Sequence, residues 1–374
     1  MEEEHFDSLI RLLNLVMRAD SSRSMTEDFP YFLRKENRGN LLVCRHGESV
    51  VSHVGLLPVK ASYFGHPLEI GMIGAVSTHP DYRRRGLASC TLEEAFRRFR
   101  RQGGHLLMIS GRRNLYSRNG AREVGEFRHY VLPRGEERIG LDAELKLQKA
   151  DEEQASEFAS LHRRKPVRFL RPMEEWKLRM GEGVCRNRLS EFCLASRGGQ
   201  PTAYAVFRVE EEQGRARCIV TEWGGRPGDA CRAVSRRVRQ ERWASSEWTL
   251  YPHETDMAGV LDSGGARFKG HRAAGGSLRV ADFCALMEAL RGYLAELLGQ
   301  QVAERLEFQE PSPGAFGVRL REDSLRIEGY GRLAEVLFGA GMEALPESLR
   351  DGPLKSALSA VLPLSPLNYD FSYV

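Results

Sequence analysis

One segment restricts the fold of this chain more than any other. A long apolar stretch over 68–78 ends at His79-Pro80-Asp81, where a proline interrupts any strand because it cannot donate to a hydrogen-bonded ladder. A basic turn and a glycine follow, and then an amphipathic helical pattern over 87–102 that Gly103-Gly104 ends. A short apolar strand is predicted over 105–110. This order predicts a strand-helix-strand crossover within a mixed α/β or α+β domain.

The residues on either side extend this domain. A helix is predicted at the N-terminus, where apolar residues recur at helical spacing, and a second one around 27–38. Two strands, 40–45 and 50–59, are joined by the turn signal His46-Gly47-Glu48 and predict a hairpin. A last strand is expected over 124–132.

The basic turn, 83–89 (RRRGLAS), has the chemistry of an anion site. The first amides of a helix have no intrahelical partner and lie at the positive end of its dipole. Gly86 allows close approach of a phosphate, and the arginines add charge-assisted hydrogen bonds. A P-loop is excluded because Gly-Lys-Ser/Thr is absent, and a dinucleotide fingerprint because the glycine spacing is wrong. The alternative is an ordinary strand-to-helix connection with solvated arginines.

A second unit is predicted to begin near Ala143, with a strand over 144–147, helices over 152–163 and 173–180, and a strand pair over 191–208. Its stretch CLASRGGQPTAYAVF is similar to LLVCRHGESVVSHVG of the first unit, which indicates a degenerate internal repeat. The arginine run 232–242, with tryptophans near it, is interpreted as a packed helix rather than as an acceptor-binding site. A third unit follows, with a helix over 282–298, a strand-like stretch over 317–329, a helix over 331–338 and a proline-punctuated tail.

Composition limits the class of protein. A chain of 374 residues with 41% hydrophobic residues has material for more than one core, so at least two domains are expected. Acidic residues stand where a secretory signal would be basic, and no run approaches the roughly 20 apolar residues that a membrane span needs. No lipidation signal is found, and a cytoplasmic protein without membrane contact is predicted.

The side chains that most often bind metals are scattered. Seven cysteines form an odd set without metal-ligand spacing, which predicts reduced core thiols, no disulfide framework and no metal site. His46, His53, His79 and His105 have no partners at ligand spacing, so core or turn roles are expected.

The segment VSTHPDYRRRGLAS resembles motif A of the GCN5-related N-acetyltransferases (GNAT), in which an Arg/Gln-x-x-Gly-x-Gly/Ala signature follows such a strand. The order of predicted elements over 1–132 matches as well. The resemblance implies acetyl-CoA as cosubstrate, with its pantetheine arm paired along the strand edge and its pyrophosphate held by the turn and helix amides. The residues that it implies for cofactor binding are Val76, Ser77, Thr78, Arg83, Arg84, Arg85, Gly86, Leu87, Ala88, Ser89, Gly111 and Arg112.

In this family a tyrosine after the crossover strand commonly faces the cofactor sulfur. Tyr116, which precedes an Asn-Gly turn, is the candidate. A phenol with an ordinary pKa near 10 can return a proton to the leaving thiolate, so Tyr116 is the candidate general acid. The alternative is a tyrosine that only packs on the core.

Three domains, of which the second lacks the signature, resemble the enhanced-intracellular-survival (Eis) type of acetyltransferase. The implied organisation is an acetyltransferase domain over 1–133, a degenerate GNAT-like domain over 134–277 and a sterol-carrier-like α+β domain over 278–374. The resemblance further implies a homo-oligomer, and a hexamer in particular. It also implies that the C-terminus enters the active site, where the α-carboxylate of Val374 would accept the proton of the incoming ammonium. A tail that only docks on the third domain is the alternative.

The leading hypothesis is N-acetyl transfer from acetyl-CoA to a small-molecule or peptide primary amine by direct attack in a ternary complex. The sequence does not identify the acceptor. The alternative from another class is a non-catalytic acyl-CoA-binding or nucleic-acid-associated regulatory protein that keeps the fold.

Overall fold

The structure, a computed structural model, describes residues 3–140, 142–185, 188–273, 275–345, 351–369 and 372. Its chain divides into two compact units. The first comprises 1–125 and 274–366, and the second comprises 126–273 and 367–373. The expected mixed α/β class is confirmed, because each unit contains a β-sheet with helices packed against it. None of the helices in the described part of the chain has the length and apolarity that crossing a bilayer requires.

The N-terminal part of the first unit carries the predicted crossover. Its elements are α1 (Glu3–Met17), α2 (Met25–Asp28), β1 (Leu41–His46), β2 (Ser49–Tyr63), β3 (His66–Thr78), α3 (Leu87–Arg101), β4 (Leu106–Ile109) and α4 (Asn114–Arg118). Strand order in the sheet is β1-β2-β3-β4-β14, with β3 and β4 parallel and the other pairs antiparallel. Helix α3 buries Leu92, Ala95, Phe96 and Phe99 in the core, as the helical spacing predicted.

The prediction of a helix around 27–38 is wrong. Helix α2 ends at Asp28, and a 3₁₀ helix follows only at Lys35–Asn40. Pro30 accounts for the difference, because it has no backbone N–H and disfavours helical geometry in the residue before it.

The second unit repeats the architecture of the first. Its elements are β5 (Phe127–Pro133), β6 (Lys146–Ala150), α5 (Ala155–His162), β7 (Val167–Phe169), α6 (Met173–Glu182), β8 (Val184–Cys185), β9 (Arg188–Arg197), β10 (Gln200–Glu212), β11 (Arg215–Gly225), α7 (Pro227–Gln240), β12 (Ser245–Leu250), α8 (Thr255–Ser263) and β13 (Arg267–Arg272). The hairpin β9-β10, antiparallel β11, helix α7 and parallel β12 follow the order of β1-β2, β3, α3 and β4. The internal repeat predicted from the sequence is therefore confirmed. Trp243 and Trp248 lie in the apolar core under α7, which confirms the packed-helix interpretation.

Strand pairing groups the chain differently from the predicted boundaries. Strand β5, placed within the first domain by a boundary at 133, pairs antiparallel with β12 in the second unit's sheet. Strand β14 (Ser277–Val280) follows the second unit in the chain but pairs antiparallel with β4. The two strands occupy equivalent places in their sheets, so each sheet is completed by a strand from a distant part of the sequence.

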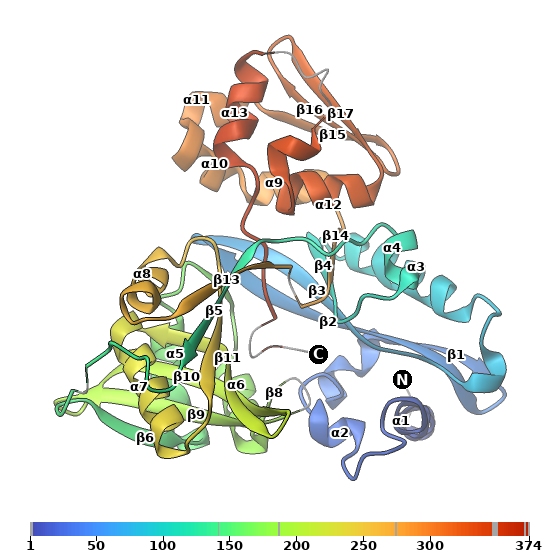
Figure 1. The fold of residues 1–374 in the computed structure, drawn as a ribbon. Helices are drawn as coiled ribbons and strands as arrows, with labels where there is room; N and C mark the ends of the chain where they lie inside the picture. The colour runs from blue at the N-terminus through green and yellow to red at the C-terminus, as the bar shows by residue number, and fades with distance from the viewer. Residues whose placement is uncertain are drawn as a thin grey trace. The chain divides into compact units, whose positions relative to one another are not determined.

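The C-terminal region forms a three-stranded sheet with helices on it (Figure 1), from α9 (Phe283–Ala289), α10 (Arg291–Leu298), α11 (Gln300–Arg305), β15 (Glu307–Ser312), β16 (Ala315–Leu320), β17 (Asp323–Glu328), α12 (Tyr330–Phe338) and α13 (Pro353–Val361). The single helix expected over 282–298 is two helices that meet at Leu290. The strand-like stretch 317–329 spans most of a hairpin, whose turn has Arg321 at a positive φ of 58°.

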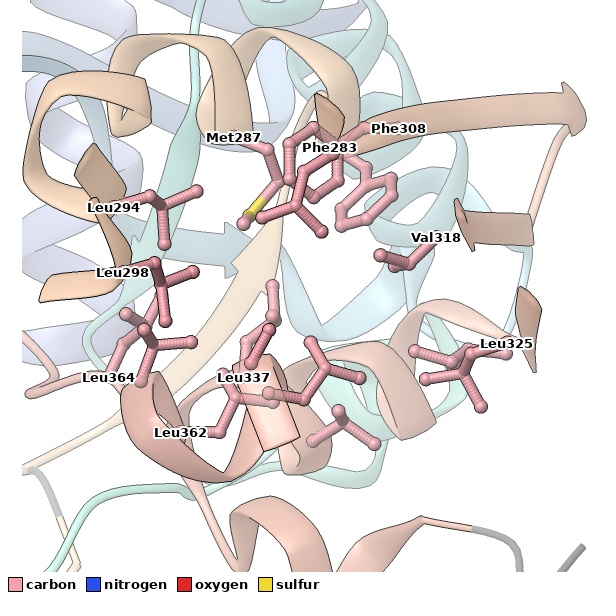
Figure 2. Close-up of a pocket in the computed structure, with 16 residues that line it drawn as sticks. Phe283, Met287, Leu294, Leu298, Phe308, Val318, Leu325, Leu337, Leu362 and Leu364 are labelled. Atoms are coloured by element: carbon pink, nitrogen blue, oxygen red, sulfur yellow. The ribbon is translucent and has the colours of Figure 1, made fainter. Parts of the chain in front are cut away.

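A wholly apolar pocket lies inside this C-terminal region (Figure 2). Its volume is about 20 Å³, which is room for little more than one water-sized sphere. The region packs as part of the first unit, where Arg100 of α3 pairs with Asp282 and Glu310. A separate sterol-carrier-like domain over 278–374 stays a prediction.

Candidate active site

Strand β3 changes its path just before the basic turn. It pairs with β4 over 70–73, which is the whole length of β4, so the residues beyond extend past the end of their parallel partner. On the other side, Ala75 and Val76 lie opposite the single residue Val54, because the register shifts between the pairs Gly55–Gly74 and His53–Ser77. Ala75 has a positive φ of 52°. Such a bulge bends a strand, and here it lies in the part of β3 that has no parallel neighbour in β4.

The buried imidazole of His53 lies against this bulge. Its Nδ1 is 2.8 Å from the carbonyl oxygen of Ala75, and the residue is fully buried. Burial lowers the pKa of His53 to about 4, so the ring is neutral at physiological pH. Because a carbonyl only accepts hydrogen bonds, Nδ1 carries the proton.

The N-terminus of α3 is open. A 3₁₀ turn, Pro80–Tyr82, follows β3, and Arg84 and Gly86 then take positive φ values of 61° and 76°. Gly86 is the N-cap and has no side chain to cap the helix, and the first turn contains no acidic residue. The N–H groups of this first turn therefore have no capping side chain, and they can bind an anion at the positive end of the helix dipole.

A cavity of about 740 Å³ joins the end of β3 to this helix terminus. Its lining residues are Val16, Val76, Ser77, Thr78, Tyr82, Arg83, Arg84, Gly86, Leu87, Ala88, Ser89, Arg113, Leu115 and Arg118. The charged side chains among them are all arginines, so the cavity is strongly positive. An anion is therefore the expected occupant of this end.

The structure separates the predicted site residues into two groups. Most of the predicted cofactor contacts line the cavity, from Val76 to Ser89. Arg85 does not: its guanidinium donates to the carbonyl of Asp81 and lies over the ring of Tyr82. Gly111 packs against the ring of Tyr116, and Arg112 pairs with Glu123 at 3.0 Å.

Tyr116 is buried, with 4% of its surface exposed, and belongs to the same apolar core as Val76. It does not line the cavity. The opposite face of α4 does, through Leu115 and Arg118, which are three residues apart and so share one side of a helix. The sequence analysis did not predict that Arg113 and Arg118 line the cavity. Their position within three residues of Tyr116, which it did select, was a signal that could have identified them.

The α-carboxylate of Val374 lies outside the described residues. Before it, the backbone amide of Ser365 donates to the hydroxyl of Tyr63 on β2, within the first unit. In the second unit Asn368 exchanges hydrogen bonds with the hydroxyl of Tyr251, and Ser372 accepts one from Arg171 at 2.7 Å. The tail therefore does more than dock on the C-terminal region.

Comparisons with known proteins agree with this geometry. Residues 1–124 match the family model of the acetyltransferase (GNAT) domain. No curated protein sequence matches the chain. Among solved structures, a GCN5-related N-acetyltransferase from Anabaena variabilis covers 90% of this chain and 88% of its own, at 15% identity and a TM-score of 0.64.

Eis1 from Mycobacterium abscessus covers 98% of this chain and 97% of its own, at 14% identity and a TM-score of 0.65. A probable N-acyltransferase from Enterococcus faecalis has 14% identity, a TM-score of 0.61, and coverage of 88% and 84%. At such identities these structures establish a shared fold. That fold extends over both units, and the resemblance to the Eis type is confirmed at this level.

The first 124 residues thus form a GNAT acetyltransferase domain, and the catalytic class is that of an acyl-CoA-dependent N-acetyltransferase. The sheet of this domain is the first of two GNAT-like sheets in the chain. Of the two corresponding segments of sequence, only the first carries the Arg-x-x-Gly-x-Ala signature.

Proposed function

We propose that the protein transfers the acetyl group of acetyl-CoA to a primary amine by direct attack in a ternary complex. One observation carries the proposal: a single cavity joins the end of β3 that extends past β4 to the uncapped start of α3, and the charged side chains that line it among the described residues are all arginines. A strand edge pairs with the amides of a pantetheine arm, and helix amides with guanidinium groups suit a pyrophosphate.

In this proposal Val76, Ser77 and Thr78 bind the pantetheine arm. The amides of Leu87, Ala88 and Ser89 hold the pyrophosphate at the start of α3, and Arg83 and Arg84 supply charge. Arg113 and Arg118, from the segment of α4, also line the cavity and add two further cations. Arg85, Gly111 and Arg112 are not among the residues that line the cavity, so in this proposal they contribute to the shape of the turn and of the segment before α4.

The chemical step requires one bond to form and one to break. The amine lone pair attacks the thioester carbonyl carbon, the C–S bond breaks, and the CoA thiolate leaves and takes up a proton. An amide at the bulge of β3 would stabilise the negative oxygen that develops on the carbonyl. Tyr116 is proposed as the general acid for the thiolate, supported by its membership of the same buried core as Val76.

The α-carboxylate of Val374 is proposed to take the proton that the substrate ammonium must lose before its nitrogen can attack. A carboxylate with an ordinary pKa near 3.5 is a weak base, so positioning of the amine would form much of its role. Adding one residue after Val374 should strongly lower turnover without lowering the unfolding temperature. Unchanged turnover would remove the terminal carboxylate from the mechanism.

A thiol-release assay with acetyl-CoA tests the function. Polyamines, aminoglycosides and lysine peptides are supplied as acceptors, and the acetylated product is identified by mass. We expect thiol release that depends on the amine. Absence of turnover with every amine, together with DNA binding that weakens steeply with salt, would favour the regulatory alternative.

We further propose a cytoplasmic homo-oligomer, which the likeness to the Eis type supports, with a hexamer as the expected state. The mass of the protein in solution, measured by light scattering after size-exclusion chromatography, tests the oligomeric state directly.

A further inference from the structure

The bulge of β3 holds an L-residue in a conformation that it rarely adopts. Ala75 has a φ of 52°, in the left-handed region, within a strand whose flanking residues pair regularly with β2. Such a conformation persists only where neighbouring groups hold it in place. The side chain that contacts the bulge is therefore informative.

That side chain is His53, the residue opposite Ser77 on β2. Its Nδ1–H donates to the carbonyl oxygen of Ala75 at 2.8 Å, and the imidazole is fully buried. The carbonyl of Ala75 and the N–H of Val76 belong to one peptide group. Because that group is planar and trans, a hydrogen bond that fixes the carbonyl also fixes the N–H in the opposite direction.

The next peptide group is held as well. Nη1 of Arg113 lies 3.4 Å from the carbonyl oxygen of Val76, in donor position. Val76 and Arg113 both line the cavity. Two side chains, one from β2 and one from the residue before α4, thus hold the two peptide groups that flank Val76, in the part of β3 beyond its pairing with β4.

The other imidazole nitrogen argues against a purely packing role. Nε2 of His53 is buried and has no hydrogen-bond partner among the described residues, and neither has the hydroxyl of Ser77 opposite. A buried acceptor without a partner destabilises the folded state. A residue that filled the same space without that acceptor would pack better, so the Nδ1 donor is the property of His53 that the fold uses.

We propose that His53 is a positioning residue for acetyl transfer: its Nδ1–H holds the Ala75–Val76 peptide so that the Val76 N–H faces the thioester oxygen. This inference rests on the proposed function. His53 touches neither substrate, and it acts through the peptide that it holds. Its effect falls on the transition state, because the amide is needed most when charge develops on the oxygen.

Three substitutions of His53 separate the effect of its Nδ1–H donor from the effect of its side-chain volume. His53→Asn keeps an N–H near the position of Nδ1 and removes the unpartnered Nε2. His53→Gln moves the donor further from the backbone, and His53→Leu removes it while keeping an apolar side chain. For each variant kcat and KM are measured with acetyl-CoA and an accepted amine, and the unfolding temperature is measured in parallel.

We expect His53→Asn to keep kcat within a few-fold of the wild type. His53→Leu and His53→Gln should lower kcat on the order of 10- to 100-fold, with smaller changes in the KM of acetyl-CoA, as for loss of a transition-state donor. Folded His53→Leu with wild-type kcat, or folded His53→Asn as slow as His53→Leu, would overturn the inference.

A second readout does not depend on turnover. In protein labelled with ¹⁵N-valine, the Val76 amide resonance should shift in His53→Leu and stay near its wild-type position in His53→Asn. Equal positions in wild type and His53→Leu would contradict the inference even if no amine were turned over. Wild-type protein without amine turnover, but with the expected resonance shifts, would instead contradict the proposed function alone.

Discussion

Arg171 and Glu222 form a bidentate ion pair in the interior of the second unit. The two guanidinium nitrogens donate to the two carboxylate oxygens at 2.8 and 2.6 Å, and the side chains are 1% and 0% exposed. The hydroxyl of Tyr204 donates to the same carboxylate at 2.8 Å. The attraction of Arg171 lowers the pKa of Glu222 below its ordinary value, against the effect of burial. Each charge therefore depends on the other to remain inside the protein.

Replacing Arg171 with Met should lower the free energy of unfolding by about 3 to 5 kcal/mol, because Glu222 is left as an uncompensated buried charge. The double variant with Glu222→Gln should recover most of this loss. Arg237→Met is the control: its partners Glu191 and Glu241 are partly exposed, so at most about 1 kcal/mol is expected. Urea unfolding at neutral pH measures all of these variants. A double variant no more stable than Arg171→Met would contradict the argument.

Acid should destabilise the protein before the carboxylates titrate. Burial lowers the pKa of His162 to about 3 and that of His53 to about 4, whereas both titrate near 6.5 in the unfolded chain. Below pH 6.5 the unfolded state binds protons that the native state does not, so stability falls as pH falls towards the native pKa values. Between pH 7.5 and pH 5.0 each histidine should remove about 2 kcal/mol.

Urea unfolding at these two pH values measures the loss, and His53→Asn supplies the control. Its loss should be smaller than that of the wild type by the contribution of one histidine. A loss of equal size in both proteins would show that His53 is not the neutral buried group that the structure describes.

The sequence predicted the elements that depend on local pattern. Apolar periodicity and the prolines and glycines around β3 and α3 define the crossover and most of the cavity wall without reference to other parts of the chain. The positive φ of Ala75 was not predictable, because alanine gives no signal for it and the bulge depends on the pairing with β2 and on His53. The pairing of β5 with the second unit's sheet and of β14 with the first unit's sheet was not predictable either, since a strand's composition does not identify its partner.

Within the basic turn the sequence made no distinction among three arginines, and the structure does. Arg84 lines the cavity with Arg118, whereas Arg85 is directed to Asp81 and Tyr82. Arg84→Gln and Arg118→Gln should each raise the KM of acetyl-CoA on the order of tenfold, because a charged hydrogen bond contributes about 1.5 to 3 kcal/mol. Arg85→Gln should leave it within about twofold of the wild type. Steady-state kinetics at low salt measures the KM of acetyl-CoA for each variant. An equal rise of this KM in all three variants would assign the effect to overall charge.

Gly86 and Gly103 provide a matched test of the helix N-terminus. They flank the two ends of α3, with φ values of 76° and 81°, and at both positions a Cβ would meet no atom within 4 Å. Alanine should therefore cost similar stability at each, about 1 to 2 kcal/mol for the left-handed backbone. Only Gly86 lines the cavity, so only Gly86→Ala should hinder approach of the pyrophosphate and raise the KM of acetyl-CoA, on the order of tenfold. Thermal unfolding and steady-state kinetics on both variants separate the two effects. If Gly103→Ala raised the KM as much as Gly86→Ala, a general loosening of α3 would explain the kinetics, and the pyrophosphate would have to bind elsewhere.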